Sequence, residues 1–164
     1  DGHMDWADGT QQLPDVKKFP EWIKVCRHFV AAHEQRLCFP LDSIRYADGL
    51  YPPYAREVIY PGVHSDVGGG YPPGDQGKAR GGSGELLSQI VLHDLYAEAF
   101  AAGAPLTVPE EVLPDKLRQI QPARNMSTET DYEFALNGVL IDRFNAWRST
   151  LGLAEESNPP TPSN

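Results

Sequence analysis

The feature that most constrains this chain is a glycine-rich stretch that follows a strand-like segment. Arg56–Val63 (REVIYPGV) is rich in β-branched and aromatic residues, which favour a β-strand. Residues 65–84 (SDVGGGYPPGDQGKARGGSG) contain eight glycines and two prolines, so they predict a long loop without regular structure. His64 stands between the two segments. The sequence therefore predicts a strand that delivers a histidine into a loop.

Helical periodicity surrounds this strand and loop. Apolar residues three and four apart after Pro20 predict an amphipathic helix over 20–35, and residues 37–46 are predicted to form an extended segment or a strand. A second helix is predicted from Glu85 to Gly103. Two more are predicted over 109–121 and 128–151. This order of elements is typical of the last portion of an α/β fold.

Length and charge limit the classes of protein that fit. The 164 residues suit one domain, predicted over 1–154, with a proline-rich tail at 155–164. The net charge of −9 argues against binding to nucleic acid, and no apolar run is long enough to span a membrane. The N-terminus lacks the features of a signal peptide. It carries no initiator methionine, so we expect the chain to be part of a longer protein.

His64 is the candidate catalytic residue. Open α/β sheets bind ligands beyond the carboxyl ends of their strands, and an imidazole held there can take and return a proton. Ser65, Asp66 and the glycines Gly68, Gly69 and Gly70 are expected to shape the loop around it or to lie near a substrate. Asp66 is expected to serve loop architecture, with a direct role as the acid partner of His64 left open. A purely structural histidine is the alternative reading.

Other chemical motifs are incomplete. Ala79 follows Lys78 where a P-loop needs Ser or Thr, and Leu37 stands where a zinc-binding H-E-x-x-H motif needs its second histidine. His33, with Glu34 and Arg36 beside it, is expected to form a structural hydrogen-bond network. Cys26 and Cys38 are predicted to be buried thiols rather than metal ligands. We therefore predict no cofactor and no metal.

The segment YPGVHSDVGGGY (Tyr60–Tyr71) resembles the histidine motif of a family of α/β-hydrolase-like domains. That family includes phospholipase A effectors of the bacterial type VI secretion system. The segments DWADGT (Asp5–Thr10), HFVAAHEQRLCFPLDSIR (His28–Arg45) and LLSQIVLHDLYAEAFAAG (Leu86–Gly103) resemble neighbouring parts of the same domain. The resemblance covers about residues 5–105.

The resemblance implies a Ser-Asp-His triad that cleaves lipid esters, with His64 as general base and general acid. The chain has no G-x-S-x-G motif. The nearest match begins at Gly81 and has Ser83 at its centre, but Glu85 stands where the last glycine should be. The family's aspartate lies in a segment before Asp5. We therefore expect the serine and the aspartate outside this chain, in a missing N-terminal part of the same domain, and expect the isolated chain to be inactive.

The resemblance also implies a bacterial protein that the type VI system delivers into the periplasm of a target cell. Its expected partners are a phospholipid substrate and an immunity or secretion-carrier protein. Two other functions stay open from the sequence: a non-catalytic interaction domain, and an esterase or acyltransferase acting on a soluble ester.

Overall fold

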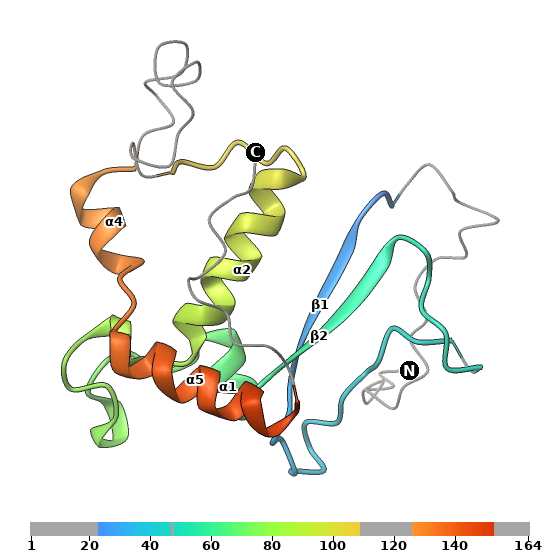
Figure 1. Cartoon of the computed structure of the whole chain (residues 1–164), viewed down its shortest axis with the longest axis horizontal. Coiled ribbons are helices and arrows are strands. Elements are labelled where there is room, and N and C mark those ends of the chain that lie inside the picture. The colour runs from blue at the N-terminus through green and yellow to red at the C-terminus, as the bar shows by residue number, and fades with distance from the viewer. Residues whose placement is uncertain (1–22, 47, 109–125, 153–164) are drawn as a thin grey trace, which may run out of the picture. The chain divides into compact units, whose positions relative to one another are not determined.

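A computed structural model describes residues 23–46, 48–108 and 126–152 (Figure 1). The chain divides into two compact units, Asp1–Val67 and Gly68–Asn164, which are described separately. The architecture is mixed α/β, with a small parallel sheet and several helices. The helix predicted over 109–121 and the tail predicted over 155–164 lie outside the described residues.

The first unit contains a parallel pair of strands, β1 (Cys26–Ala31) and β2 (Ala55–Tyr60). They lie side by side in Figure 1, with Cys26 opposite Ala55 and Ala31 opposite Tyr60. The strand predicted over 56–63 is confirmed, although β2 ends at Tyr60. The helix predicted over 20–35 is wrong where the structure describes it, because residues 26–31 form β1.

Pairing with β2 explains this error. The sequence CRHFVA contains a β-branched valine and an aromatic phenylalanine, and it satisfies its backbone groups through a neighbouring strand that lies about thirty residues away. Val30 and Tyr60 are 4% and 3% exposed and form the core of the unit together with buried Pro52. The ring of Phe29 meets the ring of Tyr60 edge-on, with centroids 5.4 Å apart.

The predicted loop at 65–84 contains more regular structure than expected. A short helix, α1 (His64–Gly68), begins at the histidine, and two 3-10 turns follow at Asp75–Gly77 and Ser83–Glu85. The carboxylate of Asp66 accepts a hydrogen bond from the backbone N–H of Val63 at 2.9 Å, while the N–H of Asp66 donates to the carbonyl of Val63 at 2.9 Å. This reciprocal pair closes the first helical turn, which the glycine count alone did not predict.

The second unit is helical. Helix α2 (Ser88–Ala101) confirms the helix predicted over 85–103, and Gly103 follows it with a φ of +90°. The helix predicted over 128–151 is instead two, α4 (Thr128–Glu133) and α5 (Gly138–Thr150). Asn137 is the N-cap residue of α5. Its side chain accepts a hydrogen bond from the N–H of Val139 at 2.8 Å. Among the described residues of this unit, the buried apolar ones are Ile90, Val91, Val108 and Leu140.

The expectation of buried thiols is corrected by the structure. Both cysteines are free, but Cys26 is only half-buried at the start of β1 and Cys38 is exposed after it.

Among the described residues, no helix combines the length and the apolar character that crossing a bilayer requires.

Candidate functional site

The candidate site forms where the chain leaves the two paired strands. The ladder continues past their ends, because the N–H of Ala32 donates to the carbonyl of Tyr60 at 2.8 Å and that of His33 donates to the carbonyl of Gly62 at 3.0 Å. The N–H of Gly62 donates in turn to Nδ1 of His33 at 2.8 Å. These bonds tie together the turns after β1 and β2. The next polar residues on each turn are Glu34 and His64.

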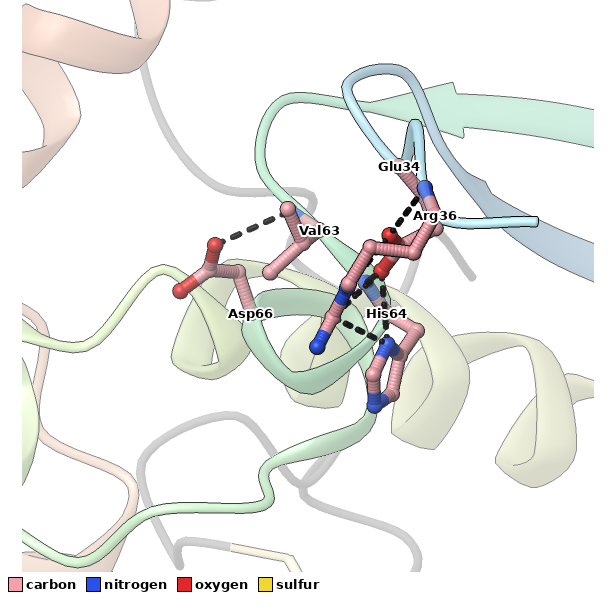
Figure 2. A network of polar contacts seen from close by, with 5 residues as sticks. All are labelled: Glu34, Arg36, Val63, His64 and Asp66. Carbon is pink, nitrogen blue, oxygen red and sulfur yellow. Dashed lines mark hydrogen bonds and ion pairs between the residues drawn. The ribbon is translucent and has the colours of Figure 1, made fainter. Parts of the chain in front are cut away.

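Glu34 and His64 are in direct contact. Oε2 of Glu34 lies 2.7 Å from Nδ1 of His64 and 3.4 Å from its backbone nitrogen. The side chain of Glu34 is only 8% exposed, whereas that of His64 is 47% exposed. A shielded carboxylate therefore faces one edge of an accessible imidazole (Figure 2).

Arg36 fixes the carboxylate from the other side. Its Nε lies 2.8 Å from Oε1 of Glu34 and its Nη2 lies 2.7 Å from Oε2, which is the two-pronged geometry that suits guanidinium and carboxylate groups. The backbone N–H of Arg36 also donates to Oε1 at 3.0 Å. These bonds, and then the contact with His64, hold the pKa of Glu34 well below its ordinary value. Glu34 is therefore ionised at neutral pH.

The contact with an ionised Glu34 favours one tautomer of His64. A carboxylate only accepts hydrogen bonds, so the proton of this contact lies on Nδ1 of the imidazole. Nη2 of Arg36 lies 3.0 Å from the same Nδ1, and its N–H can donate to Nδ1 only in the other tautomer, in which Nδ1 carries no proton. Nε2 points away from Glu34 in Figure 2. Within the described part of the chain, Nε2 has no hydrogen-bond partner.

Phe39 supports the same group from a ring face. Its centroid lies 4.3 Å from that of the His64 imidazole, with the planes 34° apart, and the Arg36 guanidinium carbon lies 4.7 Å from the Phe39 ring centre. The aromatic ring thus contacts the imidazole and the cation together. Packing as well as hydrogen bonding orients His64.

The other predicted site residues lie on α1 or directly after it. Ser65 is half-buried, and the carboxylate of Asp66 bonds to the backbone of Val63 rather than to His64 (Figure 2). Gly68, Gly69 and Gly70 are exposed, and Gly69 has a φ of +77°, which favours glycine. The acid in contact with Nδ1 of His64 is thus Glu34 and not Asp66.

Comparison with known proteins places the chain in a family. The family described as T6SS, Phospholipase effector Tle1-like, catalytic domain matches residues 3–98. The chain belongs to this family. These are effectors of the type VI secretion system, so the phospholipase and secretion assignments follow at the family level. The family match includes both Glu34 and His64.

A solved structure is similar to nearly the whole chain of this Tle1-like family member. A crystal structure of an uncharacterized protein from Pseudomonas aeruginosa matches with 46% sequence identity and a TM-score of 0.71. The match covers 96% of this chain and 20% of that one. The chain thus spans about a fifth of the length of that relative. No curated protein matches significantly.

In this Tle1-like chain, Glu34, Arg36 and Phe39 are neighbours of His64 that the sequence did not predict. It placed Glu34 and Arg36 in a network around His33, on a helix. One sequence feature could have indicated these neighbours. Glu34 and Arg36 are an acid and an arginine two residues apart, and they follow a segment that can pair with the strand before His64.

Among the described residues, no three His, Cys, Asp or Glu side chains are grouped so as to hold a metal ion.

Proposed function

We propose that this chain contributes the histidine base of a serine-type phospholipase A, as part of an α/β-hydrolase-like catalytic domain. The observation that carries the proposal is the environment of His64, whose Nδ1 lies 2.7 Å from Glu34 while none of the described residues bonds to its Nε2. Membership in a phospholipase effector family supplies the substrate class. The exposure of the imidazole, 47%, agrees with a group that meets a partner or a substrate.

In this reaction Nε2 of His64 removes the proton of a serine hydroxyl as its oxygen attacks the ester carbonyl of a phospholipid. The imidazolium then returns the proton to the leaving alcohol of the lysolipid, and an acyl-serine forms. Nε2 of His64 then removes a proton from water, whose oxygen attacks the carbonyl of the acyl-serine. The proton returns to the serine oxygen, and a fatty acid is released. In this chain the Glu34 carboxylate lies 2.7 Å from Nδ1 of the same imidazole.

The nucleophilic serine is expected outside this chain, and so is the aspartate that the family's triad uses. A base without a positioned hydroxyl activates only bulk water, so the chain alone should not catalyse acyl transfer. In cells we expect the whole protein to pass through the type VI system into the periplasm of a target bacterium. With a net charge of −9, docking onto an anionic bilayer would depend on apolar segments.

The test compares this chain with a longer polypeptide that also contains the upstream segment. Both are incubated with phosphatidylethanolamine and phosphatidylglycerol vesicles, and released fatty acid and lysolipid are measured. We expect turnover only from the longer protein, and a loss of at least about 1,000-fold in His64→Ala. His93→Gln, a substitution on α2, is the matched control and should keep full activity.

Two results would contradict the proposal. Full activity of the longer protein after His64→Ala would remove the histidine from the mechanism. Turnover by this chain alone that His64→Ala abolishes would show that the chain already holds its own nucleophile.

A further inference from the structure

We propose that residues 36–41, the apolar turn, form the surface by which this protein contacts a zwitterionic lipid bilayer. The side chains of Leu37, Phe39 and Leu41 enter the region between the phosphate headgroups and the acyl chains. The proposal rests on the proposed function, because it concerns how an ester in a lipid surface reaches His64.

The apolar turn exposes large apolar side chains in succession. Leu37 is 96% exposed, Leu41 is 53% exposed and Phe39 is 45% exposed. Every residue from 35 to 41 is exposed. A single exposed leucine is common on protein surfaces, whereas neighbouring apolar groups mark a surface that contacts a partner or a membrane.

Hydrogen bonds hold the apolar turn in one conformation. The backbone N–H of Phe39 donates to the carbonyl of Arg36 at 3.0 Å, which closes a β-turn. Leu37 and Cys38 lie at its tip. The carboxylate of Glu34 accepts bonds from the backbone N–H and the guanidinium of Arg36, and so fixes the base of the turn. Leu37 is thus presented on an ordered support, and little conformational entropy is lost when it enters lipid.

The apolar turn adjoins the proposed base. The ring centroid of Phe39 lies 4.3 Å from that of the His64 imidazole. Phe39 therefore contacts His64 with one part of its surface and leaves another part exposed. The apolar surface is continuous with the group that we propose to act on the lipid ester.

The position of the turn favours lipid over another part of the polypeptide as its partner. Strands β1 and β2 are parallel, and the turn follows β1 as His64 follows β2. Both therefore lie beyond the carboxyl edge of the sheet. Further strands pair along the sides of a sheet, whereas ligands bind beyond its carboxyl edge. The apolar turn lies where a substrate is expected to arrive.

Charge also favours contact through apolar groups. The net charge of −9 opposes approach to an anionic surface. The guanidinium of Arg36 is bonded to the carboxylate of Glu34, which compensates its charge. Burial of apolar side chains is then the main driving force for binding, as in amphipathic segments that lie in the bilayer interface. A zwitterionic lipid fits these conditions best.

The binding test uses the longer protein and vesicles of a diether phosphatidylcholine, which has no ester to cleave. Flotation measures the bound fraction. Leu37→Asp should weaken binding at least about tenfold, because a charge replaces a leucine side chain that enters lipid. Leu37→Trp should bind at least as well as the wild type, since tryptophan favours the interface. Leu50→Asp is the matched control and should bind like the wild type, because Leu50 is 65% exposed but precedes β2.

The kinetic test separates contact with the lipid surface from the chemical step. The same variants act on dihexanoyl phosphatidylethanolamine as a monomer in water, and on long-chain phosphatidylethanolamine within the diether vesicles. Leu37→Asp should lower kcat/KM on vesicles at least about tenfold and stay within about twofold of the wild type on the monomer. Circular dichroism and thermal unfolding check that each variant is folded.

The outcomes distinguish the two proposals. Equal binding of wild type and Leu37→Asp, or an equal loss in Leu50→Asp, would overturn the lipid contact. If Leu37→Asp and Leu37→Trp both lower the unfolding temperature and the activity on monomer and vesicles alike, the turn packs against the rest of the polypeptide and the lipid contact is wrong. If His64→Ala is fully active, the proposed function fails, and the flotation result alone decides the lipid contact.

Discussion

His28 and Glu57 face each other across the parallel strands and are hydrogen-bonded, with Nδ1 of the histidine 3.0 Å from Oε2 of the glutamate. The Glu57 side chain is 5% exposed. It also accepts hydrogen bonds from the Ser43 hydroxyl at 3.1 Å, the Ile44 N–H at 3.2 Å and the Tyr51 hydroxyl at 3.3 Å. This carboxylate therefore ties the segment between the strands to β2.

Glu57→Gln should lower the free energy of unfolding by about 1–3 kcal/mol at neutral pH, because it weakens several bonds to a shielded charge. Burial raises the pKa of Glu57, but the Ile44 N–H, His28 and Ser43 together bring it below its ordinary value. A lowered pKa means that the stabilisation is complete above the unfolded-state pKa of about 4.3 and is lost as the pH falls through the folded-state value.

Urea unfolding followed by circular dichroism at a series of pH values checks this expectation. The difference between wild type and Glu57→Gln should be constant near neutral pH and should shrink below about pH 4. Glu133→Gln, exposed on α4, should unfold like the wild type at every pH. A difference that grows on acidification would contradict the assignment.

Gly62 is the glycine on which the candidate site most depends. Its φ is +103°, and a Cβ added there would lie 2.5 Å from Cβ of Asp66. Gly62→Ala should therefore cost more than the roughly 1–2 kcal/mol of left-handed backbone strain, and it should displace α1 with His64. Gly49→Ala is the control, because Gly49 has a φ of +84° but no atom within 4 Å of the added Cβ. Equal losses of stability in the two variants would show that the contact with Asp66 is unimportant.

The parts of the fold that follow local rules were predictable from the sequence. The β-branched and aromatic residues of 56–60 identified β2, and the apolar spacing before Gly103 identified α2. The segment 26–31 was predicted as helix because Cys26, Phe29 and Val30 are also three and four residues apart. Only the pairing with a distant strand decides between helix and strand for this segment. The spacing of apolar residues within the segment gives no information on that pairing.

The same limit applies to the site. His64 is predicted as the candidate base from its place after a strand and from its motif, both of which are local. Glu34 lies thirty positions earlier, and its contact depends on the register of β1 against β2. A helix over 20–35 contains no strand that pairs with β2, so that prediction does not bring Glu34 close to His64. Asp66, close in sequence, was the nearer candidate, but the first turn of α1 directs its carboxylate to Val63.

The two cysteines should differ in reactivity. Cys38 is exposed in the segment after Glu34 and Arg36, whereas Cys26 is half-buried within β1. Under native conditions iodoacetamide should modify Cys38 faster than Cys26, since the reagent needs access to the thiol. Peptide mass spectrometry over a time course measures both rates. In urea the two rates should become similar, and an equal rate without denaturant would contradict the placement of Cys26 in a paired strand.

In the second unit, Gly84 and Gly138 should respond to alanine in opposite ways. The carbonyl of Gly84 accepts a hydrogen bond from the N–H of Asn137 at 2.9 Å, and an added Cβ would lie 3.0 Å from the carbonyl oxygen of Ala135. That oxygen belongs to the backbone, so Gly84→Ala should separate the turn from the start of α5 and cost about 1–3 kcal/mol. Gly138, the first residue of α5, has open space around its Cβ position. Gly138→Ala should leave stability unchanged or raise it by up to about 1 kcal/mol, because alanine loses less backbone entropy in a helix. Thermal unfolding of the two variants measures the contrast, and a stabilised Gly84→Ala would show that the turn does not pack against residues 135–137.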